Sequence, residues 1–131
     1  MGIEFFGPKD SPSAIVIRQS ARSESIEFFS PKHFPQQIGL MSRPSGYLVP
    51  GHIHNEVSRE ISLTQEVLMI RKGRCEIFLY AENSEQTRIE LTVGDVILLA
   101  SGGHSISMLE DCEILEVKQG PYLGPNDKTF I

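Results

Sequence analysis

Two histidines lie two positions apart in the first half of the chain. His52 and His54 are separated by Ile53 alone, and alternate residues of a β-strand point to the same face of the strand. Two neutral imidazoles in that arrangement lie close enough to share one metal ion. Inside a folded β protein each ring nitrogen also needs a partner, and a metal supplies one to both rings. The pair therefore predicts a metal site.

The residues that frame this pair resemble the first motif of the cupin family. The motif has the order Gly, His-x-His, Glu, Gly, which is matched here by Gly46, His52, His54, Glu66 and Gly73. Five residues separate Gly46 from His52, and six separate Glu66 from Gly73. A second stretch resembles the second cupin motif, which has a Gly-Asp turn, a strand, a glycine turn and a histidine.

That second stretch runs from Gly94-Asp95 through Ala100 and Gly102 to His104. Together the two resemblances cover residues 46 to about 108, roughly half of the chain. The resemblance implies a small all-β fold, the cupin-type double-stranded β-helix or jelly-roll barrel.

The resemblance also implies one metal ion bound by three imidazoles and one carboxylate, namely His52, His54, Glu66 and His104. Eleven residues lie between His54 and Glu66, so Glu56 and Glu60 remain alternative carboxylate ligands. Such a donor set suits one divalent transition metal, Mn, Fe, Ni, Co or Zn. Because the imidazoles must be neutral to bind, occupancy is expected to fall as the pH drops toward ~6.5 and below.

Four protein ligands leave two positions of an octahedral ion open for the oxygens of a substrate. The motif resemblance then implies a metal-dependent enzyme of the isomerase or epimerase type, acting on a small sugar-like or hydroxy-carbonyl molecule. A non-haem Fe(II) dioxygenase and a non-catalytic metal- or ligand-binding cupin are the alternatives. Tyr47, Glu116 and Lys118 fall near the motif-bearing strands and are candidate proton carriers, with none singled out. His33 is expected to be a surface or packing residue.

Short apolar runs divided by 11 glycines and 8 prolines predict about ten strands and no helix. The clearest are residues 66–70 and 75–80, a hairpin divided by Lys72-Gly73, and residues 88–93, in which Ile89, Leu91 and Val93 alternate with polar residues. The other predicted strands are residues 14–18, 26–29, 37–42, 47–49, 52–54, 96–100, 104–109 and 113–118. Residues 55–64 are expected to form a polar loop.

The chain is expected to have an N-terminal arm (1–35), a β-barrel (36–120) and a C-terminal tail (121–131). Six apolar residues of the arm exceed what a small barrel can cover: Phe5, Phe6, Ile15, Ile17, Phe28 and Phe29. Small cupins commonly pair, sometimes by exchanging an N-terminal strand. We therefore expect a homodimer.

The composition excludes several classes of protein. A formal charge of −5, without a cluster of Lys or Arg, argues against binding to nucleic acid or acidic membranes. No apolar stretch approaches the ~20 residues that span a bilayer, and no signal peptide begins the chain. Cys75 and Cys112 are too few for a disulfide framework and are expected to be core thiols. A cytoplasmic location is expected.

Overall fold

The structure, a computed structural model, describes residues 2–81 and 84–131. This part of the chain is all-β, as the sequence predicts. Its strands are β1 (Ile3–Phe6), β2 (Ala14–Ile17), β3 (Ile26–Phe28), β4 (Gly39–Met41), β5 (Glu66–Lys72), β6 (Arg74–Ala81), β7 (Ser84–Thr92), β8 (Val96–Leu99), β9 (Gly103–Met108) and β10 (Glu113–Lys118), followed by the 3₁₀ turn η1 (Gly124–Asp127).

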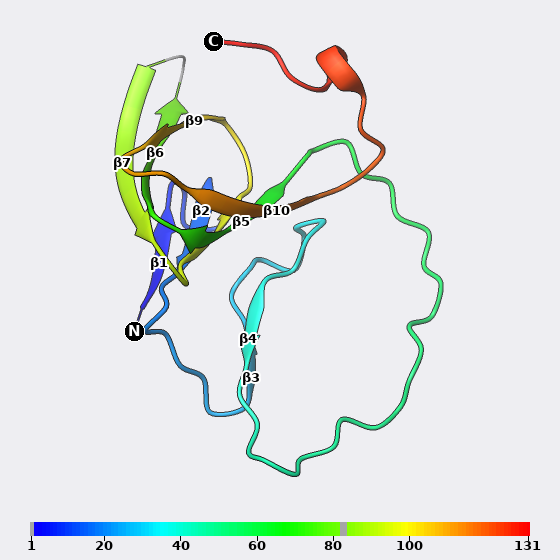
Figure 1. Ribbon diagram of the computed structural model, residues 1–131. Coiled ribbons are helices and arrows are strands. Elements are labelled where there is room, and N and C mark those ends of the chain that lie inside the picture. Colours follow the sequence, from blue (N-terminus) through cyan, green and yellow to red (C-terminus); the bar gives the residue numbers. More distant parts are fainter. Residues whose placement is uncertain (1, 82–83) are drawn as a thin grey trace.

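All strand pairs are antiparallel and form three sheets (Figure 1). The largest has the order β1-β2-β8-β5-β10, the second has the order β7-β6-β9, and β3 pairs with β4 as a separate ribbon. The chain passes between the five-stranded and three-stranded sheets four times, in the β5–β6, β7–β8, β8–β9 and β9–β10 connections. No helix in the described ranges has the length and apolar character needed to cross a membrane.

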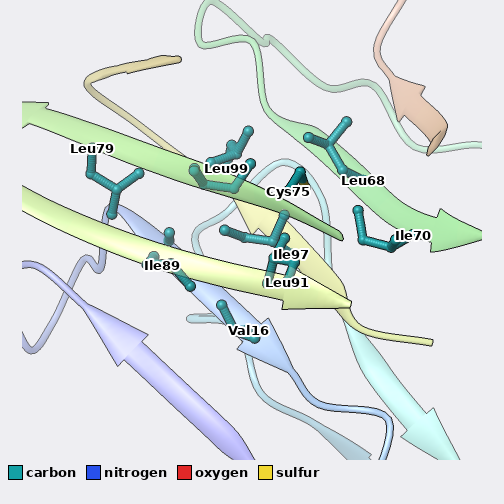
Figure 2. Close-up of a cluster of buried hydrophobic side chains, with 11 residues drawn as sticks. Val16, Leu68, Ile70, Cys75, Leu79, Ile89, Leu91, Ile97 and Leu99 are labelled. Carbon is teal, nitrogen blue, oxygen red and sulfur yellow. The ribbon is translucent and has the colours of Figure 1, made fainter. Parts of the chain in front are cut away.

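The main hydrophobic core lies between these two sheets (Figure 2). Alternate residues of each strand point into it, as the period of two in a strand requires. The five-stranded sheet contributes Ala14, Val16, Leu68, Ile70, Ile97 and Leu99, and the three-stranded sheet contributes Cys75, Ile77, Leu79, Ile89 and Leu91. The prediction that Cys75 is a core thiol is confirmed, whereas Cys112 is only partly buried.

A second core covers the opposite face of the five-stranded sheet. Ile15, Ile17 and Leu98 point to that side and pack with Phe34 and Ile38 of the segment that carries β3 and β4. The expectation that Ile15 and Ile17 are exposed is therefore wrong, because both faces of β2 are covered. A strand buried on both faces carries a continuous apolar run instead of an alternating one.

The two main sheets do not close into a barrel in the described part of the chain. β9 and β10 each lie at a sheet edge, with one side unpaired. Residues 42–65 contain no strand, so the strands predicted at 47–49 and 52–54 are not found. The segment stands off from both sheets as a wide loop (Figure 1), where no neighbouring strand supplies hydrogen bonds. The predicted loop at 55–64 is confirmed.

Candidate functional site

A pocket of about 860 Å³ opens at the end of the space between the two sheets. Its walls come from the start of β5, from β9 and β10, and from the C-terminal tail. The polar and charged side chains in its lining are Thr64, Glu66, Tyr80, His104, Ser105, Glu116, Lys118, Tyr122, Asp127, Lys128 and Thr129. Glu66, Glu116 and Lys118 lie here on the face of β5 and β10 that carries the core residue Leu68.

Glu66 and His104 line this pocket and contact each other. Glu66 is the first residue of β5, and its side chain lies on the same face as Leu68, which belongs to the main core. His104 lies on β9, on the same face as Ile106, which packs against that core. Glu66 Oε1 and His104 Nε2 are 3.2 Å apart. The fold therefore joins one residue from each of the two predicted motifs.

Glu116 of β10 adds a second carboxyl group at this point. Hydrogen bonding to His104 lowers the pKa of Glu66 to about 2, against an opposing effect of burial. A hydrogen bond with Glu66 raises the pKa of Glu116, because two close carboxylates are unfavourable when both are charged. The two carboxyl groups thus differ in proton affinity although they are neighbours. Glu66 is the one held ionised.

Lys118 places a positive charge beside this carboxyl pair. Its Nζ lies 3.7 Å from Glu116 Oε1 and 3.1 Å from Asp127 Oδ2. The ion pair with Asp127 ties the η1 turn of the tail to β10 and raises the pKa of Lys118. The Tyr122 ring lies near the same ammonium group, with 5.4 Å between Nζ and the ring centroid. The tail thereby forms one wall of the pocket.

His52 and His54 lie elsewhere, in the exposed segment 42–65. Their ring centroids are 5.2 Å apart, and His52 Nδ1 is within hydrogen-bond distance of Pro50 O, at 2.8 Å. Both side chains are exposed. The alternative ligands Glu56 and Glu60 occupy the same segment and are exposed as well. None of these four residues lines the pocket that holds Glu66 and His104.

The predicted metal ligands thus fall into two separate pairs. One pair is Glu66 with His104 in the pocket, and the other is His52 with His54 in the segment. Among the residues that the structure describes, no group of three or more His, Cys, Asp or Glu side chains is placed to bind a metal ion. A single chain in this conformation therefore does not assemble the predicted four-ligand site, although each pair has the donor types that a transition metal accepts.

Of the three candidate proton carriers, the structure brings two to the pocket. Glu116 and Lys118 line it, whereas Tyr47 lies in the exposed segment, where Arg43 stacks over its ring at 4.6 Å from the centroid. Asp127 was not identified from the sequence, because no motif accompanies it and only the path of the tail carries it to Lys118. His33 is exposed and packs edge-on against Phe34, consistent with a surface or packing residue.

Comparison with known proteins found no match for this chain. No protein-family model, no curated protein and no solved structure matches this chain. The functional argument therefore depends on the pocket itself.

Proposed function

We propose that the pocket binds a small polar molecule of the sugar-like or hydroxy-carbonyl class and catalyses proton transfer on it, as an isomerase or epimerase does. The observation that carries this proposal is the meeting of Glu66, His104, Glu116 and Lys118 at one place in the pocket. Its volume of about 860 Å³ falls within the ~300–1,000 Å³ of small-molecule sites.

The reaction class follows from the charges that these residues supply. Isomerisation of a hydroxy-carbonyl compound begins when a base removes a proton from the carbon next to the carbonyl group, while an acid protonates the carbonyl oxygen. The resulting enediol then accepts a proton at the former carbonyl carbon, and the hydroxyl group on the other carbon loses one and becomes the new carbonyl group. Substrate and product therefore contain the same atoms. The site must therefore hold a base and an acid side by side.

Glu66 and Glu116 meet that requirement. Neighbouring carboxyl groups whose pKa values are shifted in opposite directions are an arrangement in which one group serves as base and the other as acid. Hydrogen bonding to His104 lowers the pKa of Glu66, and the neighbouring Glu66 raises the pKa of Glu116. The ammonium group of Lys118 stabilises negative charge that develops on a substrate oxygen nearby. These groups supply acid, base and electrostatic stabilisation within one pocket.

The proposal takes the chain to be a cupin-type jelly roll. Its support is the motif resemblance, the antiparallel sheets packed over a common core, and the meeting of Glu66 with His104. In this proposal β9 and β10, which end the two sheets, are the edges at which further strands would close the barrel. The proposal would place the two unmatched motif histidines on one of those strands.

The test is exchange of substrate hydrogen with solvent. The protein is incubated in D₂O with glyceraldehyde, dihydroxyacetone and a series of four- to six-carbon aldoses and ketoses, and deuterium on carbon is followed by NMR. We expect exchange with a subset of these compounds and a loss of ~100-fold or more in Glu116→Gln. Glu113→Gln is the matched control, because Glu113 lies on the same strand but pairs with Arg71 outside the pocket.

Binding without exchange would favour the non-catalytic ligand-binding alternative. If none of these compounds binds and none exchanges hydrogen with solvent, the proposal is contradicted. Equal losses in Glu116→Gln and Glu113→Gln would show that the pocket residues are not responsible.

A further inference from the structure

The C-terminal tail places a carboxylate inside the pocket. Residues 121–131 form one wall without forming a strand, and the η1 turn brings Asp127 to Lys118 of β10. Asp127 Oδ2 lies 3.1 Å from Lys118 Nζ, and the Asp127 side chain is only 16% exposed. One ammonium group of the pocket is therefore already bound to a carboxylate, and this carboxylate belongs to the chain itself.

Few contacts hold the tail against the sheets. In the described ranges, no backbone–backbone hydrogen bond joins residues 121–131 to a strand. Tyr122 is 75% exposed and Phe130 is 87% exposed, so the tail buries little apolar surface where it lies. Segments with few buried contacts open at a much smaller cost in free energy than global unfolding. Asp127 can therefore leave Lys118 while the sheets stay folded.

Lys118, by contrast, belongs to a paired strand. It lies opposite Glu66 in the β5–β10 register, and its Nζ is 3.7 Å from Glu116 Oε1. When Asp127 leaves, the ammonium group stays beside the two carboxyl groups that the proposed reaction uses. The Lys118 side chain is only 29% exposed, and a partly buried cation that loses its hydrogen-bonded partner is destabilised. This position therefore favours another anionic group.

A carboxylate fits this position better than a neutral group or a phosphate. It restores the charge-assisted hydrogen bond that Asp127 makes, and it leaves the net charge of the pocket unchanged. A hydroxyl group supplies no charge. A phosphate dianion would bring a second negative charge close to Glu66 and Glu116, and like charges at short range repel. The chemistry of the position thus favours a monoanion that resembles the Asp127 side chain.

We propose that the substrate is a small hydroxy-carbonyl acid whose carboxylate replaces that of Asp127 on Lys118, and that Asp127 thereby determines which substrates the pocket accepts. This inference deepens the proposed function and rests on it. Because Lys118 Nζ and Glu116 Oε1 are only 3.7 Å apart, the bound carboxylate lies next to the reacting carbon atoms. The carbonyl group is then adjacent to the carboxylate, as in a 2-oxo acid with a hydroxyl group on carbon 3.

The test compares two three-carbon ketones. Hydroxypyruvate carries a carboxylate where dihydroxyacetone carries a hydroxymethyl group. One proton moves from carbon 3 to carbon 2 and another from the hydroxyl oxygen to the carbonyl oxygen, so hydroxypyruvate becomes tartronate semialdehyde without gain or loss of atoms. Deuterium exchange is followed by NMR, and the rate without protein is subtracted. We expect the KM of the wild type to be ~10-fold or more lower for hydroxypyruvate than for dihydroxyacetone.

Asp127→Asn removes the competing carboxylate and keeps the size of the side chain. Removal of an internal competitor raises the fraction of chains that can bind the acid, so the KM for hydroxypyruvate should fall by a further ~10-fold. The ratio of the two KM values should change by the same factor, because dihydroxyacetone does not compete with Asp127 for Lys118. A purely structural role of Asp127 would shift both KM values together. Asp10→Asn is the control, since Asp10 is exposed and lies outside the pocket.

Binding without turnover tests Lys118 directly. Glycerate has a carboxylate but no carbonyl group beside it, and glycerol is its neutral counterpart. Calorimetry should show glycerate binding that Asp127→Asn strengthens and that Lys118→Met weakens by ~10-fold or more, with glycerol bound weakly throughout. Lys72→Met is the control, because Lys72 is exposed at the end of β5, outside the pocket. Circular dichroism shows whether each variant is folded, and Lys118→Gln replaces Lys118→Met if the latter is not.

Two sets of results would overturn this inference. One is equal affinity for glycerate and glycerol, or glycerate binding that Lys118→Met leaves intact. The other is an equal shift of both KM values in Asp127→Asn. The proposed function would still stand if neutral compounds exchange deuterium in a manner that depends on Glu116. Conversely, glycerate binding that depends on Lys118, without exchange of any compound, would support the carboxylate position and contradict the catalytic proposal.

Discussion

At the scale of single residues, Gly73 illustrates how a motif residue acts through the backbone. It forms the turn between β5 and β6 with a φ of +79°, a conformation that residues with a side chain rarely adopt. A Cβ at this position would also lie 2.3 Å from the carbonyl oxygen of Asp111. Its place in the motif therefore reflects the geometry of the turn.

We predict that Gly73→Ala lowers the free energy of unfolding by about 2 kcal/mol or more, because backbone strain adds to the contact with Asp111. Gly51→Ala is the matched control, since no atom lies within 4 Å of a Cβ placed there. It should shift the stability by no more than ~0.5 kcal/mol. Urea unfolding followed by circular dichroism measures both, and equal effects would contradict the role given to the turn.

Asp95, in the Gly-Asp turn of the second predicted motif, is a structural residue. Its carboxylate is buried and accepts hydrogen bonds from the backbone N–H groups of Gln19 and Thr92, each at 2.9 Å. Arg18 lies between Asp95 and Glu4, with Nη1 3.2 Å from Asp95 Oδ2 and Nε 2.6 Å from Glu4 Oε2. This network joins the β7–β8 turn to the end of β2.

The contribution of Glu4 to the stability of the fold is expected to depend on pH. The hydrogen bond from Arg18 holds the pKa of Glu4 below its usual value of 4.5. A carboxyl group whose pKa is depressed by folding stabilises the folded state above its unfolded pKa, and this contribution is lost as the pH falls through the folded pKa. We therefore expect Glu4→Gln to lower the urea midpoint at pH 7, and the difference from wild type to shrink below pH 4.5. A constant difference across that range would contradict the assignment.

At the scale of elements, β8 is the strand on which both cores depend. It lies between β2 and β5, and its side chains alternate between the main core at Ile97 and the second core at Leu98. The strand thereby joins the layer that carries the pocket to the layer formed by residues 21–40. Loss of packing here is expected to affect the whole domain.

We predict that Ile97→Ala costs about 2–5 kcal/mol of unfolding free energy, because Ile97 is fully buried and the cavity cannot collapse between two sheets. Ile61→Ala, in the exposed segment, is the control and should cost less than ~0.5 kcal/mol in the monomeric state, measured at low protein concentration. Urea unfolding at low and at high protein concentration separates the contribution of packing within one chain from that of association between chains. A small effect of Ile97→Ala would show that β8 is not central.

At the scale of the whole molecule, the segment 43–64 carries the largest group of exposed apolar side chains of any one segment, and others lie on the β3–β4 ribbon, on β10 and in the C-terminal tail. Of the six apolar residues of the N-terminal arm, Ile15 and Ile17 are buried and Phe6 and Phe29 are partly buried, whereas Phe5 and Phe28 remain exposed. Association is therefore predicted to depend on the segment more than on β2.

We predict that Leu48→Ser with Ile53→Ser weakens self-association by ~100-fold or more, since burying two such side chains contributes about 3 kcal/mol or more to a dimer. Val93→Ser is the control, because Val93 is exposed in the β7–β8 turn, outside the segment. Sedimentation equilibrium gives the dissociation constants. Unchanged association in the double variant would place the interface elsewhere.

The sequence by itself determined the strands that carry strong local signals. Alternating apolar residues marked β6 and β7, and glycine turns marked their ends, because these features depend on neighbours along the chain. β1 was missed, since four residues bounded by Gly2 and Gly7 show little periodicity and the strand is defined by pairing with β2. The strands predicted around His52 were wrong for the corresponding reason, because a local pattern does not supply a pairing partner.

The residues of the candidate site fall into the same two groups, those that the sequence indicates and those that only the fold brings together. The motif resemblance singled out Glu66 and His104, which the fold places 3.2 Å apart although 37 residues lie between them. Only the tertiary structure brought Glu116, Lys118 and Asp127 to the same pocket, and only it separated His52 and His54 from that pocket. The sequence shows which residue types are present and how far apart they lie along the chain. Their meeting depends on contacts between distant strands, whose free energy is set by packing across the whole molecule.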